Sequence, residues 1–333
     1  LLAKSRAESA RRRAQDERLA VAAQWNIRIQ IAEAKEKNMD IRNLEGSIVA
    51  LVTPFKKDGS VDFDALERLI DFHLQNGTDA ILTLGTTGES ATMTDDEDNS
   101  VVAAVVKHVA GRVPVIAGSG SNSTQTMLTK SLTYQGLGAD GLLLITPYYN
   151  KSTQEGLVAH YTEIAEKTSL PIVVYNVPSR TGVNIQPATL EKICRLPQVV
   201  AVKEANPDVA QAMEKINLVG DDATFYCGND DLTIPLMVLG FQGVISVLSN
   251  VMPAETSKMT SLALSGNWAE ASKMQRDLLP MVKALFCETS PIPCKAAMSM
   301  MGMCRNELRL PLIPMQEANQ QKLADIMRGW KLI

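Results

Sequence analysis

The 333-residue sequence has no uninterrupted apolar stretch approaching the roughly 20 residues that a membrane-spanning helix needs. Its first residues also lack the hydrophobic core of a secretory signal. It has no basic stripe interleaved with aromatic residues, and its formal net charge is −4, so nothing favours nucleic acid as a partner. We therefore expect a soluble, cytoplasmic protein that acts on a small molecule.

Cysteine and histidine are scarce, and they do not gather in a metal-binding pattern. The five cysteines are an odd set, without a CxxC pair or a histidine at zinc spacing: Cys194, Cys227, Cys287, Cys294 and Cys304. We interpret them as reduced packing residues. The three histidines, His73, His108 and His160, fall in stretches with helical periodicity. We therefore expect no metal and no cofactor.

Residues 1–38 differ from the rest of the chain. Arg11, Arg12 and Arg13 lie in a charged, Ala-rich helical stretch, and Met39 precedes the first strand pattern. The arginines suit a transit peptide, but such peptides are poor in acidic residues and this stretch has several. We expect a charged helical extension, either a solvated helix or the product of an upstream in-frame start.

From Ser47 onward, short runs rich in Val, Ile and Leu alternate with segments of helical periodicity, which predicts a parallel sheet of strand-helix units. The eight predicted strands are 47–53, 80–85, 114–118, 141–147, 171–177, 199–205, 224–228 and 243–248. The eight predicted helices are 62–76, 94–109, 123–135, 154–168, 187–195, 207–217, 231–239 and 253–264. Eight such units close into a (β/α)8 TIM barrel, which we assign to residues 39–266.

A doubly wound open sheet is the competing architecture. It usually carries a Gly-rich phosphate loop after the first strand, whereas Thr53-Pro54-Phe55 follows that strand here. After Leu264 the pattern is helical only, at 268–287, 293–301 and 316–330. We therefore expect residues 267–333 to form a C-terminal helical appendage to the barrel.

Lys203 is the most informative residue, because it interrupts the apolar run Val199–Ala205. Burying an ammonium group is costly unless the group is paired or loses its proton. Burial lowers the pKa of a lysine, and a neutral amine can attack a carbonyl to form a Schiff base. The alternative is a snorkelling lysine at a strand end, paired with Glu204.

Barrel enzymes carry their active sites at the C-terminal ends of the strands. The turn Gly85–Ser90 follows the second strand, and its glycines expose backbone N–H groups beside the hydroxyls of Thr86 and Thr87. This chemistry suits a carboxylate. A plain Gly-rich turn, with a threonine capping the next helix, is the alternative.

Tyrosine is scarce, with six in the chain, yet Tyr148, Tyr149 and Tyr175 lie at two strand ends. A phenol can transfer protons, although each ring could instead be a core or interface aromatic. Arg180 follows Tyr175 and offers a planar fork for a carboxylate, or an ordinary surface ion pair.

Gly228 and Ile245, at the seventh and eighth strands, complete the ring of strand ends around Lys203. An amine that forms an imine, a carboxylate cradle, phenols and an arginine together specify a metal-free aldol-type condensation of a 2-oxo acid.

Three segments, Gly85–Ser90, Tyr175–Gly182 and Val202–Ala205, resemble the signature segments of the dihydrodipicolinate synthase family. The resemblance covers roughly Leu44 to the C-terminus. The wider family includes N-acetylneuraminate lyase and other pyruvate-dependent aldolases. The resemblance implies a lyase that condenses pyruvate with L-aspartate 4-semialdehyde in lysine and diaminopimelate biosynthesis.

The resemblance also implies roles for the residues that match. Lys203 binds pyruvate as an imine, and Tyr175 donates and accepts protons. Thr87 and Tyr149 complete a relay, with Tyr149 reaching across a subunit interface. Thr86 and Thr87 hold the pyruvate carboxylate.

Arg180 receives the carboxylate of the semialdehyde, Ile245 lines the pyruvate pocket, and Gly228 is grouped with the substrate-binding residues. The family is usually a homotetramer built as a pair of tight dimers, and we expect the same here.

Some family members bind lysine as an inhibitor. Four residues match that effector site: Ser90, Ala91, Asn122 and Tyr148. Three others, Asp95, Asp98 and Thr126, stand where lysine-sensitive members carry two histidines and a glutamate. We predict weak or absent inhibition by lysine.

Two other functions compete with the synthase. A lyase or aldolase for a sugar acid would be better served by neutral groups at the Arg180 segment. A catalytically silent barrel that binds an oxo acid would give no borohydride-trapped adduct.

Overall fold

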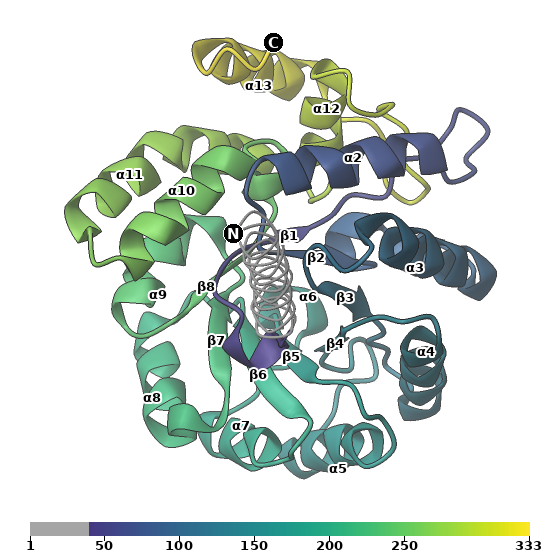
Figure 1. Cartoon of the computed structure of the whole chain (residues 1–333), viewed down its shortest axis with the longest axis vertical. Helices are drawn as coiled ribbons and strands as arrows, with labels where there is room; N and C mark the ends of the chain where they lie inside the picture. Colours follow the sequence, from purple (N-terminus) through teal and green to yellow (C-terminus); the bar gives the residue numbers. More distant parts are fainter. Residues whose placement is uncertain (1–39) are drawn as a thin grey trace, which may run out of the picture.

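The computed structural model describes residues 40–333, so the predicted extension, residues 1–38, lies outside the described residues. Eight parallel strands close into a barrel in chain order, with β1 beside β8 (Figure 1). The strands are β1 Gly46–Ala50, β2 Ala80–Thr83, β3 Val115–Gly118, β4 Gly141–Ile145, β5 Ile172–Asn176, β6 Val199–Glu204, β7 Thr224–Cys227 and β8 Gly243–Ser246. The predicted (β/α)8 barrel is confirmed, and the open sheet is excluded.

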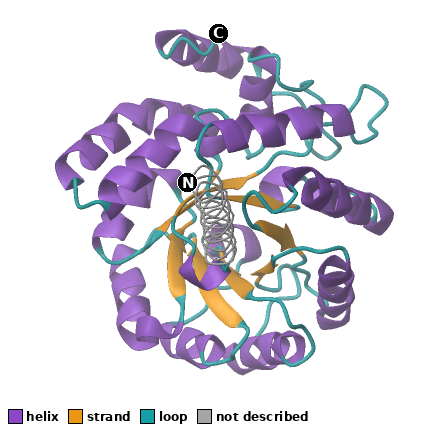
Figure 2. Ribbon diagram, in the orientation of Figure 1, coloured by secondary structure: helices purple, strands orange, loops and turns teal. Residues whose placement is uncertain are grey.

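Helices surround the strands as an outer ring (Figure 2). The barrel helices are α2 Phe63–Gln75, α3 Asp95–Val109, α4 Thr124–Gly136, α5 Gln154–Ala165, α7 Pro187–Cys194, α8 Val209–Val219, α9 Thr233–Val238 and α10 Pro253–Leu264. A single turn, α6 (Pro178–Thr181), and six 3-10 turns were not predicted; they are η1 Ile41–Asn43, η2 Thr86–Gly88, η3 Ser90–Thr92, η4 Gly220–Asp222, η5 Asp230–Leu232 and η6 Leu248–Asn250.

The C-terminal helices are α11 Trp268–Leu285, α12 Ile292–Met300 and α13 Glu317–Gly329. The predicted C-terminal helical region is confirmed. The predicted division of the chain at residues 266 and 267 stays a prediction. Among residues 40–333, no helix combines the length and apolar character needed to cross a bilayer.

The strands bury both faces because neighbouring side chains alternate between two apolar clusters. Ile48 and Ala50 of β1 belong to the cluster inside the barrel. Val49, between them, belongs to the cluster that packs with the surrounding helices. This double burial explains why the strands read as continuous apolar runs in the sequence.

Closure between β1 and β8 depends on a close backbone approach. Gly243 has a φ of 157°, and a Cβ atom placed on it would lie 2.0 Å from the carbonyl oxygen of Gly46. Past the strand ends, the buried amide of Asn250 donates to the carbonyl of Ala50 at 2.8 Å and accepts from the N–H of Val52 at 3.0 Å. These contacts hold β1 against the chain that follows β8.

Candidate active site

Lys203 lies on β6 between Tyr175 of β5 and Tyr226 of β7, with which it is in register. It is 6% exposed, and its Nζ lies 4.4 Å from the centroid of the Tyr175 ring. Burial lowers the pKa of Lys203 to about 8, an effect that Asp230 opposes and Arg180 reinforces. With that pKa, about one amine in ten is neutral at pH 7.

Glu204 does not pair with Lys203. Successive residues of a strand face opposite sides, and Glu204 forms a 2.6 Å ion pair with Lys215 of α8, each side chain being 1% exposed. The Glu204 carboxylate also accepts from the Asn176 amide at 2.8 Å. The interpretation of Lys203 as a snorkelling partner of Glu204 is therefore wrong.

The Tyr175 phenol faces the same space as the Lys203 amine. Burial raises the pKa of Tyr175 to about 12, while Arg180 and a hydrogen bond with the Thr86 side chain lower it and Glu204 raises it. The phenol is thus protonated at neutral pH and able to donate a proton.

The segment Gly85–Ser90, here called the threonine turn, connects β2 to α3. Leu84 and Glu89 flank its central residues, and both have a φ of 55°, in the left-handed region that non-glycine residues rarely adopt. Thr86 is exposed and Thr87 is buried, and both reach the same cavity. The turn thus contributes both threonines to the cavity that Lys203 also lines.

A cavity of about 190 Å³ lies at the C-terminal ends of the strands. It is smaller than the roughly 300–1,000 Å³ of sites for drug-sized ligands, so its size suits a small oxo acid. Gly228 lines it, and a Cβ there would lie 3.2 Å from Cε of Lys203 and 2.7 Å from Cβ of Ala205. The bare backbone of Gly228 therefore leaves room for the lysine side chain.

The structure brings most of the predicted site residues to this cavity: Thr86, Thr87, Tyr175, Arg180, Lys203 and Gly228 all line it. Arg180, on α6, is exposed at its mouth, and its Nη2 donates to the carbonyl of Ser290 at 3.2 Å. Ile245 packs inside the barrel in the same cluster as Tyr175, but it does not line the cavity. Tyr149 is 92% exposed and lies outside the cavity.

Three residues near the amine were missed from the sequence. Asp230 is 3% exposed, and its Oδ2 accepts from the N–H groups of Val247 and Leu248, both at 3.0 Å. Burial raises the pKa of Asp230, and Lys203 is among the groups that lower it. Because Asp230 follows Gly228 closely at the end of β7, the strand-end rule could have found it.

Phe286 and Ser290, which also line the cavity, come from the segment between α11 and α12. No periodicity or strand-end signal in the sequence points to them. The C-terminal region is therefore part of the cavity wall and not only an appendage to the barrel.

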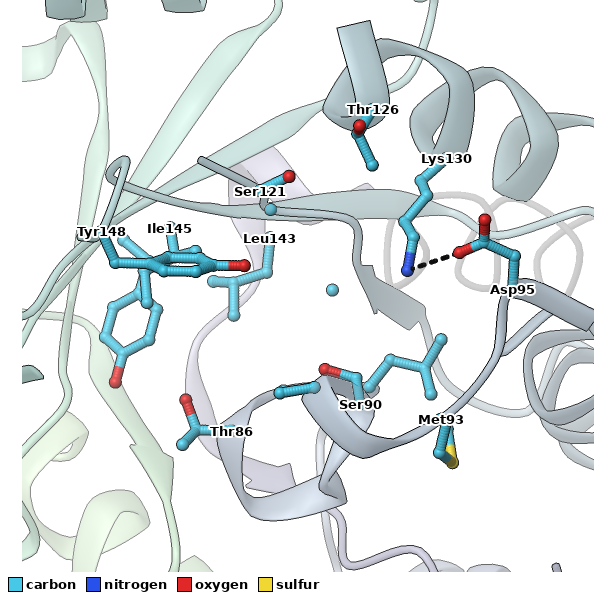
Figure 3. A pocket seen from close by; sticks show the side chains of 16 residues that line it. Thr86, Ser90, Met93, Asp95, Ser121, Thr126, Lys130, Leu143, Ile145 and Tyr148 are labelled. Atoms are coloured by element: carbon cyan, nitrogen blue, oxygen red, sulfur yellow. Dashed lines mark ion pairs between the residues drawn. The ribbon is translucent and has the colours of Figure 1, made fainter. Parts of the chain in front are cut away.

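A second cavity, of about 330 Å³, shares Gly85, Thr86 and Tyr175 with the first. Figure 3 shows Lys130 of α4 reaching toward Asp95 at the start of α3, with Nζ and Oδ1 3.1 Å apart. Of the predicted effector residues, three line this cavity: Ser90, Ala91 and Tyr148. The fourth, Asn122, does not line it, and its carbonyl accepts from the Asn150 amide at 2.9 Å.

The histidines lie in α2, α3 and α5, in helices as predicted. Across residues 40–333, no group of three or more His, Cys, Asp or Glu side chains is arranged to hold a metal ion. The side chains of Lys203, Tyr175, Thr86, Thr87 and Arg180 supply an amine, a phenol, two hydroxyls and a guanidinium to the cavity.

The model of the dihydrodipicolinate synthetase family matches residues 43–329. The 4-hydroxy-tetrahydrodipicolinate synthase of Alkaliphilus oremlandii is 49% identical over 289 residues, which are 87% of this chain and 99% of that protein.

Among solved structures, the dihydrodipicolinate synthase of Thermotoga maritima is 46% identical with a TM-score of 0.86, over 87% of this chain and 99% of that one. The enzyme of Cyanidioschyzon merolae with lysine bound is 39% identical with a TM-score of 0.85, over the same shares of the two chains, 87% and 99%.

Proposed function

The chain belongs to the dihydrodipicolinate synthetase family, and from that membership we propose that it is a 4-hydroxy-tetrahydrodipicolinate synthase. This lyase condenses pyruvate with L-aspartate 4-semialdehyde in the biosynthesis of diaminopimelate and lysine. The observation that carries the proposal is the amine of Lys203, which is buried in the barrel mouth with its pKa lowered to about 8.

The first step is imine formation. The neutral Nζ of Lys203 adds to the keto carbon of pyruvate, and the resulting carbinolamine loses water to give the Schiff base. Tyr175, protonated and beside Nζ, supplies the proton that leaves with the hydroxyl. The hydroxyls of Thr86 and Thr87 hold the pyruvate carboxylate.

The second step forms the carbon-carbon bond. The methyl carbon of the imine loses a proton to give an enamine, which attacks the aldehyde carbon of the semialdehyde. The amino group of that substrate then adds to the imine carbon, which closes the ring and releases Lys203. Tyr175, with Thr87 and Tyr149, relays the protons.

Binding of the semialdehyde is assigned to Arg180, whose guanidinium stands exposed at the cavity mouth. A planar fork suits a carboxylate, and a sugar acid offers hydroxyls at the corresponding position. Gly228 completes the wall, and Ile245 supports the pyruvate pocket from inside the barrel. The working enzyme is a cytoplasmic homotetramer, a pair of tight dimers.

The test is mass spectrometry after the protein is mixed with pyruvate and reduced with borohydride. We expect one pyruvate-derived adduct, mapped to the peptide that contains Lys203. Lys203→Met is the control and should give none. An adduct on another lysine, or no adduct on the folded wild-type protein, refutes the mechanism.

Turnover discriminates the synthase from a related lyase. We expect turnover of pyruvate with L-aspartate 4-semialdehyde, and little cleavage of N-acetylneuraminate or of 2-keto-3-deoxy sugar acids. Faster cleavage of a sugar acid would identify the chain as a different member of the wider family.

A further inference from the structure

Glu89 is a buried carboxylate inside the threonine turn. It is 3% exposed, although it lies directly beside the residues that face the cavity. Its φ of 55° is unusual for a residue with a side chain, and the same is true of Leu84, directly before the turn. Backbone in this region persists only where the surrounding structure holds it.

The partners of Glu89 come from the C-terminal region. Oε1 of Glu89 lies 2.6 Å from Nζ of Lys295 on α12, and both side chains are almost fully buried. Oε2 of Glu89 accepts from the backbone N–H of Arg309 at 3.1 Å. Both carboxylate oxygens of the turn are therefore held by residues that lie beyond the barrel strands.

Lys295 and Arg309 are themselves fixed. Nζ of Lys295 donates to the carbonyl of Glu307 at 2.7 Å and lies 3.9 Å from the centroid of the Phe55 ring. The guanidinium carbon of Arg309 lies 4.4 Å from the centroid of the same ring. The two cations thus share one aromatic ring, which follows β1.

The side chain of Arg309 also contacts two residues that follow Glu89, Thr92 and Glu97. Nη1 donates to the carbonyl of Thr92 at 3.0 Å, and the guanidinium forms a two-pronged pair with Glu97 of α3, at 2.8 and 2.5 Å. Nη2 donates to the carbonyl of Gly59 at 2.7 Å. Arg309 therefore links the β1–α2 loop to the β2–α3 segment, which contains the threonine turn.

We propose that Lys295, through the Glu89 carboxylate, and Arg309, through Glu89 and through its side-chain contact with the carbonyl of Thr92, act as positioning residues for the hydroxyls of the threonine turn. In this arrangement Lys295 and Arg309, which do not line the cavity, set the geometry of the carboxylate cradle without touching the substrate. The inference rests on the proposed function and deepens it, because it assigns residues beyond the barrel to pyruvate binding.

The test compares three variants with the wild-type enzyme. Glu89→Gln combined with Lys295→Met removes both charges together, so no charge is left buried without a partner. Arg309→Lys keeps a cation at a partly exposed site and removes the planar fork. Lys273→Met is the matched control, since it makes the same kind of change in the exposed Lys273–Asp277 pair of α11.

Two measurements separate positioning from stability: the melting temperature, and the pyruvate concentration that half-saturates borohydride trapping of Lys203. A displaced cradle should raise that concentration by about 10-fold to 100-fold in the first two variants, since small displacements have effects of this size. The KM for the semialdehyde should stay within about twofold of the wild-type value, because its binding groups are untouched. The control should match the wild type in both measurements.

Wild-type half-saturation in the folded double variant and in Arg309→Lys overturns the inference. Should the double variant fail to fold, Arg309→Lys decides alone, with raised half-saturation supporting the inference and an unchanged value refuting it. A purely structural role would lower the melting temperature and the trapped fraction without moving the half-saturation. Failure of the wild type to form the Lys203 adduct would instead count against the proposed function.

Discussion

At the scale of single residues, burial of Lys203 lowers the stability of the folded protein but favours its reaction. The ammonium loses its hydration inside the barrel, and imine formation needs the neutral amine. The same desolvation does both: it destabilises the protonated side chain and it lowers the pKa to about 8. Asp230 keeps the shift moderate, since its carboxylate favours the charged form. Burial of the reactive amine thus destabilises the folded protein, and it leaves a fraction of the amine unprotonated at neutral pH.

Lys203→Met should therefore stabilise the protein at neutral pH. The pKa of Lys203 is lower in the folded protein than its ordinary value of 10.5, so between pH 8 and 10.5 the unfolded chain binds more protons and stability rises with pH. Below pH 8 the destabilisation is complete, at roughly 3 kcal/mol. Urea denaturation should show a gain of up to about 3 kcal/mol for the variant at pH 7 that shrinks toward pH 10. A variant less stable than the wild type at pH 7 would contradict this account.

Arg180→Ala should mainly weaken binding of the second substrate. The guanidinium is exposed at the cavity mouth, and its Nη2 donates a hydrogen bond to the carbonyl of Ser290. It also lowers the pKa values of Lys203 and Tyr175. Loss of a charge-assisted hydrogen bond should raise the KM for the semialdehyde by about 10-fold to 100-fold. Steady-state kinetics with each substrate varied in turn checks this. A comparable rise in the KM for pyruvate alone would assign Arg180 to the other substrate.

At the scale of elements, helices α3 and α4 bring two aspartates and a lysine together beside the second cavity. Asp98 of α3 is 1% exposed, and its Oδ2 lies 2.6 Å from Nζ of Lys130 on α4. The same Nζ lies 3.1 Å from Asp95, and the Tyr134 hydroxyl donates to Asp98 at 3.4 Å. A cation belonging to the chain thus already pairs with both carboxylates.

This arrangement gives a physical reason for the predicted weak or absent inhibition by lysine. The ammonium of a free lysine would meet Asp95 and Asp98 already paired with Lys130. Steady-state turnover titrated with lysine should therefore change little at sub-millimolar concentrations. Norleucine, which lacks the side-chain ammonium, is the matched control. Strong inhibition by lysine but not by norleucine would show that the cavity still accepts the cation.

The type and order of every barrel strand and helix, apart from the single turn α6, could be predicted from periodicity, but the ends of the strands could not. The first strand was predicted to run from residue 47 to 53, whereas β1 ends at Ala50. Leu51 and Val52 are also buried, at 2% and 0% exposure, so the apolar run continues after the strand ladder has ended. Side chains therefore remain buried beyond the last residue that pairs with a neighbouring strand. The apolar pattern of the sequence indicates burial but not strand pairing.

The strand-end rule brought Lys203, Tyr175 and both threonines to one cavity because all parallel strands of a barrel end on the same face. It says nothing about contacts made by later helices. The pairing of Glu89 with Lys295 joins residues that are far apart in the chain, and neither has a periodic signature. Such partners become visible only when the helices are placed around the barrel.

At the scale of the whole molecule, the exposure of Tyr149 is a feature that one chain does not explain. Its side chain is 92% exposed, and its φ of 67° holds it in the left-handed region. Tyr148, beside it, is 38% exposed. An aromatic ring so fully in solvent is typical of surfaces that bind another protein, since such rings are enriched in interfaces. We expect a second copy of the chain to cover this loop.

Subunit mixing tests whether Tyr149 acts in the cavity of a neighbour. Lys203→Met lacks the amine and Tyr149→Phe lacks the phenol, so each variant alone should have little activity. If Tyr149 works across a two-fold interface, a dimer of one subunit of each kind contains one complete site, formed by Lys203 of one chain and Tyr149 of the other. Equal amounts of the two variants, dissociated and reassembled together, should then recover about a quarter of the wild-type activity, since half of the dimers are mixed and each has one complete site of two. If Tyr149 instead served its own chain, mixing would restore nothing, because every site would still lack either the amine or the phenol.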